Sequence, residues 1–243
     1  MLLPLALKEK EELNKELTLI IVYDNKVYKR GLRNGWGFSC FIKTKNYSLL
    51  FDTGADPKTL LLNMKDLKIN PLDLDSIFIS HEHLDHTGGF SAILKLNPNL
   101  KVFIPKSASV EIPEKNVIRI EKFTLIYENI YSTGELGGFV KEQSLVVNTS
   151  KGLVIITGCA HPGILNIVKK VKENLKDKIY LVIGGFHLFG EDEETIKEIA
   201  NEMFNLTYLI CPCHCSGDLA EKVFRGIFKK RFLECGVGRE INV

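Results

Sequence analysis

Short apolar runs, many of them rich in β-branched residues, recur along the chain between polar or glycine-containing segments. Such runs predict β-strands, whereas longer stretches with apolar residues every three or four positions predict helices. We predict strands at residues 17–23, 38–43, 47–51, 77–79, 102–105, 144–147, 153–157, 178–183, 208–212 and 232–235. The first three should form an antiparallel meander, and the strands at 144–147 and 153–157 a hairpin.

Helical signals lie between several of these strands. Asp56 and Pro57 have the capping and first-turn chemistry that opens a helix, which should run to about residue 67. Further helices are expected up to about residue 96 and over residues 163–176, 191–204 and 218–229, whereas the segment between the strand at 102–105 and residue 144 is a polar middle region. The alternation of strands and helices favours an α/β fold.

Length and composition narrow the class of protein. At 243 residues the chain fits one domain over 1–243, in which residues 1–16 are an appended N-terminal helix rather than a signal peptide. With 32 Lys and Arg against 30 Asp and Glu, nothing favours nucleic acid or a membrane as partner, and no apolar run is long enough to span a bilayer. The six cysteines do not form a disulfide framework, so we expect a reducing, cytoplasmic setting.

The most informative stretch is 80–89, which follows the apolar strand at 77–79. It carries His81, His83, Asp85 and His86. In extended chain His81 and His83 point the same way, whereas Asp85 and His86 come from the following turn and can face a second position. Imidazole and carboxylate ligands suit zinc, iron or manganese, and an unmetallated cluster of this kind would be costly to bury. The stretch therefore predicts part of a metal site, with two metals the favoured count.

The remaining histidines show the same placement. His161, His187 and His214 each lie just past an apolar strand, with glycines close by. Ligands delivered from the ends of several strands are how an α/β sheet builds a site at one edge. We therefore expect all six histidines of the chain to share one site.

These residues carry a resemblance to a known family. The pattern His81-x-His83-x-Asp85-His86 after an apolar strand, preceded by Phe51-Asp52-Thr53-Gly54, resembles the metallo-β-lactamase superfamily. The resemblance covers about residues 17–243. It implies a four-layer αββα sandwich with a metal site at the sheet edge.

Four further motifs resemble a narrower subfamily. They are the stretches 35–39, 157–163, 184–188 and 212–217. The subfamily is named for the 7,8-dihydropterin-6-yl-methyl-4-(β-D-ribofuranosyl)aminobenzene 5′-phosphate synthase of methanopterin biosynthesis. Most of its members are described only as metal-dependent hydrolases.

The resemblance also implies roles for individual residues. His81, His83 and a third histidine would hold a first metal, and Asp85, His86 and His214 a second. Asp52 would accept a hydrogen bond from a ligand imidazole and fix its tautomer. Asp85 and His187 are the candidate catalytic residues.

The chain departs from the superfamily pattern at two places. Cys159 occupies the slot of a metal-bridging aspartate, so it can bridge as a thiolate, bind one metal or lie outside the coordination sphere. The usual third histidine before that strand is missing, because residues 87–160 contain none. His161 and His187 compete for that role; we favour His161, which leaves His187 in the substrate pocket as a proton donor or phosphate contact.

The cysteines around His214 have a different interpretation. Cys211, Cys213 and Cys215 alternate with it, so a continuous strand would turn all three away from the imidazole. Packed thiols are favoured over a separate zinc or iron–sulfur site, because the spacing matches neither the C-x-x-C zinc pattern nor a ferredoxin run.

The favoured function is a metal-dependent hydrolase, in which a metal-activated water attacks a phosphoester or ester-type bond of a small-molecule substrate, possibly phosphorylated. One or two divalent ions per chain, zinc first and iron or manganese next, would be the cofactors. The alternative within the resemblance is a pterin-related transferase that releases pyrophosphate. A non-catalytic metal-binding protein is a third hypothesis, and the oligomeric state is not predicted.

Overall fold

A computed structural model describes residues 16–110, 112 and 114–243. Apart from residue 16, the predicted N-terminal helix lies outside these described residues. Within them, one sheet has seven strands in the order β13-β1-β2-β3-β4-β5-β6. Its strands are β1 (Leu17–Tyr23), β2 (Ser39–Thr44), β3 (Ser48–Phe51), β4 (Ser76–Phe78), β5 (Lys101–Pro105), β6 (Val117–Ile120) and β13 (Glu240–Asn242).

The other sheet of the described chain has six strands in the order β12-β11-β10-β9-β8-β7. Its strands are β7 (Thr124–Tyr127), β8 (Ile130–Ser132), β9 (Leu145–Thr149), β10 (Gly152–Thr157), β11 (Ile179–Gly185) and β12 (Thr207–Cys213). The α-helices are α2 (Pro57–Asp66), α3 (Leu84–Thr87), α4 (Phe90–Leu96), α5 (Ile164–Asn174), α6 (Glu193–Leu206) and α7 (Asp218–Phe228). Short 3-10 turns are η1 (Pro71–Asp73), η2 (Glu114–Asn116), η3 (His214–Ser216) and η4 (Lys229–Arg231).

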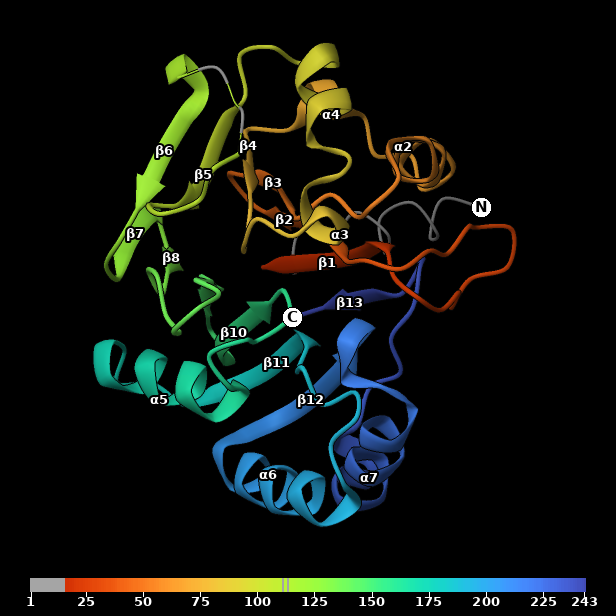
Figure 1. Cartoon of the computed structure of the whole chain (residues 1–243), viewed down its shortest axis with the longest axis vertical. Helices are drawn as coiled ribbons and strands as arrows, with labels where there is room; N and C mark the ends of the chain where they lie inside the picture. The colour runs from red at the N-terminus through yellow and green to blue at the C-terminus, as the bar shows by residue number, and fades with distance from the viewer. Residues whose placement is uncertain (1–15, 111, 113) are drawn as a thin grey trace, which may run out of the picture.

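The two sheets pack face to face, with helices on both outer sides (Figure 1). Alternate residues of one strand serve different layers: Val154 and Ile156 of β10 pack between the sheets, whereas Leu153 and Ile155 pack against α5, α6 and α7. The outer face of the first sheet packs on α2 and α4 in the same way. Because both faces of the central strands are covered, strands such as β10 and β11 are apolar on both faces. The architecture is the predicted four-layer αββα sandwich.

The strand directions explain where a site can form. Strands β3, β4, β5 and β6 run parallel to one another, and so do β10, β11 and β12. Parallel strands bring their carboxyl ends to the same edge of a sheet. The segments that follow β3, β4, β10, β11 and β12 contain the histidines and the carboxylates singled out above.

Several predicted elements match the structure closely. The meander over β1, β2 and β3 is antiparallel, and β9 and β10 form the predicted hairpin. Helix α2 begins where the sequence predicts, since the Asp56 carboxylate caps it by accepting a hydrogen bond from Thr59 N at 2.8 Å.

Two predictions were wrong. The polar middle region contains three short strands, β6, β7 and β8, because its apolar residues pair at or next to the sheet edges without forming long buried runs. Residues 232–235 do not form the last strand: Phe232 makes only an isolated bridge to Ile210, and the last strand is β13, which pairs with β1. In the described chain, none of the helices is both long enough and apolar enough to span a membrane.

Candidate metal centre

The candidate ligands lie on the loops and short helical turns that follow the strands. His81 follows β4, Cys159 and His161 follow β10, and His187 follows β11. The backbones of Asp52, His187 and His214 have φ angles of 51°, 53° and 50°. Non-glycine residues take this left-handed conformation at a cost and keep it only where the surrounding structure enforces it, which is common at functional sites.

A first ligand group consists of His81, His83 and His161. One ring nitrogen of each lies within 4.8 Å of the others. His81 Nε2 and His83 Nδ1 face each other at 3.1 Å, and the His161 ring lies 4.6 Å from that of His81, centroid to centroid. Imidazole nitrogens converge in this way when they share one metal, since Zn–N bonds are about 2.0–2.1 Å long.

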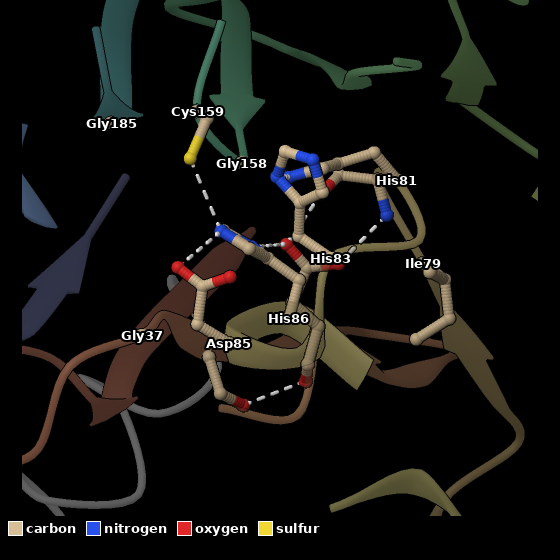
Figure 2. A network of polar contacts seen from close by, with 12 residues as sticks. Gly37, Ile79, His81, His83, Asp85, His86, Gly158, Cys159 and Gly185 are labelled. Atoms are coloured by element: carbon tan, nitrogen blue, oxygen red, sulfur yellow. Dashed lines mark hydrogen bonds and ion pairs between the residues drawn. The ribbon is translucent and has the colours of Figure 1, made fainter. Parts of the chain in front are cut away.

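A second ligand group consists of Asp85, His86, Cys159 and His214, whose ligand atoms also lie within 4.8 Å of one another. His86 Nε2 is 3.2 Å from His214 Nε2 and 3.2 Å from Cys159 Sγ. Figure 2 shows the Cys159 sulfur and the Asp85 carboxylate both directed at the His86 ring. Asp85 Oδ2 lies 3.3 Å from His214 Nε2, so the carboxylate faces both imidazoles.

His187 occupies a different position. Its ligand atom groups with those of Cys159 and His161, and its ring centroid is 4.5 Å from that of His161. It does not belong to the group of His81 and His83. The geometry thus brings His161 to that pair and leaves His187 exposed beside it, although the coordination roles themselves stay predictions.

Hydrogen bonds behind the rings orient them. Asp52, fully buried, pairs through Oδ2 with His86 Nδ1 at 2.7 Å and accepts bonds from Ser80 N and Ser80 Oγ, each at 2.7 Å. Ser80 Oγ in turn lies 2.9 Å from His81 Nδ1. Asp52 therefore fixes His86 directly and His81 through a hydroxyl, which leaves their Nε2 atoms free to bind a metal.

A second buried carboxylate, that of Glu142, was not predicted from the sequence. It accepts backbone N–H groups from Gly158, Cys159, Ala160 and His161 at 2.9–3.1 Å, and its Oε2 lies 2.9 Å from His161 Nδ1. Burial raises the pKa of Glu142, but the bonds from His161 and the amides outweigh it and lower the pKa to about 2. Glu142 thus shapes the whole loop after β10. It lies in the polar middle region, where a buried acid has no sequence signature.

Asn25 is a second residue that the sequence analysis missed. Its Oδ1 lies 3.1 Å from His214 Nδ1, and its Nδ2 donates to the carbonyl oxygen of His214 at 3.0 Å. The His214 ring is therefore fixed with Nε2 toward Asp85. Only its place in the turn after β1 could have suggested this residue.

The donor set fits divalent transition metals. Burial and the neighbouring imidazole of His214 lower the pKa of His86 to about 3, and burial lowers the pKa of His81 well below its usual value. Both rings are therefore neutral, as metal ligands must be. Burial raises the pKa of Asp85, yet hydrogen bonding to His214 and the neighbouring imidazoles hold it below its usual value, so this carboxylate is ionised.

The positions of the cysteines around His214 differ from the prediction. Strand β12 ends at Cys213, and the 3-10 turn η3 that follows sends Cys215 toward the candidate centre. Cys215 Sγ lies 3.5 Å from the carbonyl oxygen of Cys159. The prediction that Cys211, Cys213 and Cys215 share one face was therefore wrong for Cys215, because the chain leaves the strand before it.

Comparisons with known proteins agree with this architecture. The model of the metallo-β-lactamase superfamily matches residues 37–168. The chain is 33% identical to the 7,8-dihydropterin-6-methyl-4-(β-D-ribofuranosyl)-aminobenzene-5′-phosphate synthase of Methanocaldococcus jannaschii, over 80% of this chain and 84% of that protein. An uncharacterised protein of the same organism is 28% identical, over 81% of this chain and 90% of that protein.

A solved structure is also similar. The crystal structure of Tm1679, a metal-dependent hydrolase of the β-lactamase superfamily, superposes with a TM-score of 0.79 at 28% identity, and covers 93% of this chain and 99% of that one. The family match, the sandwich and the strand-end ligand groups lead to one conclusion: the chain belongs to the metallo-β-lactamase superfamily.

Proposed function

We propose that this protein is a metal-dependent hydrolase that cleaves a phosphoester or ester-type bond of a small molecule. The observation that carries the proposal is the pair of adjacent ligand groups, three imidazoles in one and two imidazoles with Asp85 and Cys159 in the other. Divalent metal ions bound there would polarise an acceptor oxygen and activate water at neutral pH.

The side chains of this chain have separate tasks in that reaction. Asp52 and Glu142 hold the imidazoles in the tautomer that presents a free nitrogen. Asp85, whose side chain is 20% exposed, faces both second-group imidazoles and orients the attacking group. His187 is exposed at the rim, and contact with the Cys215 thiol raises its pKa, which suits a proton donor to the leaving group.

The surroundings of the second ligand group favour a substrate with a planar ring. Trp36 and Phe189, which we call the aromatic rim, are 54% and 75% exposed. The Trp36 ring lies 5.2 Å from the His214 ring and 6.4 Å from the Phe189 ring, centroid to centroid. Exposed flat side chains beside a reaction centre provide stacking surface for an aromatic or heteroaromatic group.

The second candidate function is a pterin-related transferase, which the 33% identity to the synthase favours. In that reaction a carbon or nitrogen nucleophile would displace diphosphate from a pterin methyl carbon. The carbon–oxygen bond to diphosphate breaks, the new bond to carbon forms, and the nucleophile loses a proton. The aromatic rim suits this substrate as well and therefore does not distinguish the two functions. They differ in the bond that is made. A non-catalytic metal-binding protein is the third candidate, and absence of turnover with any metal would favour it.

The first experiment measures metal content and turnover on simple phosphoesters and carboxylic esters. His83→Ala should lower metal content and turnover together, because it removes a first-group ligand. Glu82→Gln is the matched control, since the Glu82 carboxylate bonds Ser109 N at 2.8 Å and lies outside both ligand groups. Unchanged metal content in the His83 variant would contradict the ligand set.

The second experiment separates His187 from His161. His187→Ala should reduce turnover by roughly 100-fold, the usual contribution of a positioned proton donor, with metal content unchanged. His161→Ala should lower metal content. The reverse pattern would make His187 the ligand.

Pyrophosphate release from a pterin diphosphate that requires an arylamine acceptor, without hydrolysis of simple esters, would select the transferase instead.

A further inference from the structure

A second cluster of metal-binding side chains lies outside the strand-end centre. The carboxylate of Asp24 and the thiols of Cys213 and Cys235 have ligand atoms within 4.8 Å of one another. They come from three separate segments: the end of β1, the end of β12 and the irregular chain before β13. None of them belongs to the two ligand groups of the candidate centre.

Cys211 is the candidate for a fourth ligand. Cys211 and Cys213 are two residues apart on β12, so their side chains lie on the same face, and both are buried in the core between the sheets. The Cys235 thiol interacts with both of them. Two sulfurs and one carboxylate oxygen, those of Cys213, Cys235 and Asp24, therefore lie within 4.8 Å of one another, and the Cys211 thiol lies beside that of Cys235. A tetrahedral zinc with bonds of about 2.3 Å to sulfur needs ligand atoms about 3.8 Å apart, which this spacing accommodates.

Charge and burial point the same way. Asp24 is only 1% exposed, and its Oδ1 accepts a hydrogen bond from His214 N at 3.1 Å. A carboxylate enclosed with thiols is costly to bury unless a cation or several donors compensate it. The Arg239 guanidinium lies near the Cys211 and Cys235 thiols. A divalent ion bound by Asp24, Cys213 and Cys235 would supply the compensation that this enclosed carboxylate needs.

We propose that Asp24, Cys213 and Cys235, with Cys211 as the fourth ligand, bind a structural zinc ion separate from the strand-end centre. The ion ties the end of β1 to β12 and to the C-terminal segment. Because Asp24 also holds the backbone of His214, the site supports the second ligand group from behind. All positions are protein ligands, as in structural zinc sites, so no chemistry is assigned to it.

Cobalt substitution of the full chain tests the proposal. Cys159→Ser first removes the thiolate of the strand-end centre. In this variant the thiolate-to-cobalt absorption should persist, and adding Cys235→Ser should abolish most of it with the loss of one metal equivalent. Adding Cys40→Ser instead should leave both unchanged, because Cys40 is a buried free thiol outside the cluster.

A second measurement does not depend on the cysteine-cluster variants folding. X-ray absorption of the zinc-loaded Cys159→Ser chain should show sulfur neighbours at zinc. Absence of zinc–sulfur scattering would overturn the proposal. So would an unchanged cobalt spectrum in the Cys235 variant, or an intact mass that shows a disulfide among these thiols after aerobic purification.

Discussion

Individual residues of the candidate centre are oriented from behind. His86, His161 and His214 each have a polar partner at Nδ1, which is Asp52, Glu142 or Asn25. The partner fixes the ring and leaves Nε2 to face the centre, because a neutral imidazole has one donor and one acceptor nitrogen. The candidate ligands are thus pre-positioned by polar groups that lie outside both ligand groups.

Among these partners, Glu142 is the one whose substitution we use as a test. In Glu142→Gln an amide NH₂ replaces an oxygen and faces backbone N–H groups, so donors are left unpaired in a buried place. The free energy of unfolding should fall by roughly 3 kcal/mol. Metal affinity should fall by roughly 10- to 100-fold, the usual effect of losing such a partner. Denaturant unfolding and metal titration measure the two effects.

The control for that change is Glu121→Gln. Glu121 pairs with Lys106 at the surface, at 2.8 Å, and contacts no residue of the centre. Glu121→Gln should have the same free energy of unfolding and the same metal affinity as the native chain. Equal behaviour of the two variants would mean that the Glu142 carboxylate does not organise the loop after β10.

At the scale of elements, the sequence predicted buried strands better than edge strands. Strands such as β10 and β11 are apolar on both faces and were predicted within a few residues. Strands β6 and β7 lie at the open edges of the two sheets and leave Ile118 and Leu125 exposed, so no continuous apolar run marks them.

At the site, too, some residues could be predicted from the sequence and others could not. The histidines were predicted from their placement after apolar strands, and the fold brings all six together with Cys159 and Asp85. Glu142 and Asn25 were not predicted, since local sequence does not distinguish a buried polar residue from a surface one. Cys215 was assigned to the wrong face because the end of β12 depends on the turn η3, which hydropathy does not reveal.

The close approach of β10 to the end of β4 can be tested at Gly158. A β-carbon there would lie 2.1 Å from Ser80 Oγ and 3.1 Å from Asp52 Oδ2. Gly158→Ala should therefore displace Ser80 and Asp52, lower the free energy of unfolding by roughly 1–3 kcal/mol and weaken metal binding. Thermal unfolding measures the change in stability, and metal titration measures the change in metal binding.

Gly138→Ala is the matched control, because nothing lies within 4 Å of a β-carbon built at that position. We expect native stability and native metal affinity in this variant. If the Gly158 variant also kept both properties, the packing of β10 on β4 would not position the centre.

Across the whole molecule, the candidate ligands come from both halves of the sandwich. His81 follows a strand of the seven-stranded sheet, whereas His161 and His214 follow strands of the six-stranded sheet within the described chain. A metal bound to ligands from both sheets links them at one edge. Metal binding should therefore stabilise the folded state as a whole.

Chelation should lower the thermal stability of the entire domain. Free metal at about 1,000 times its dissociation constant contributes about 4 kcal/mol to folding, and this is lost on removal. Calorimetry of the chain before and after chelation should show a lower transition temperature, restored by adding zinc. An identical transition in both states would indicate that the ligand groups do not hold a metal.

From the two ligand groups we propose that two adjacent metals lie at this edge of the sandwich. The most direct measurement is anomalous scattering from crystals of the zinc-loaded protein. We predict two neighbouring peaks at the strand ends, one beside His81, His83 and His161 and one beside Asp85, His86 and His214. No peak at this edge would rule out the metal centre, and a peak coordinated by His187 in place of His161 would overturn the proposed ligand set.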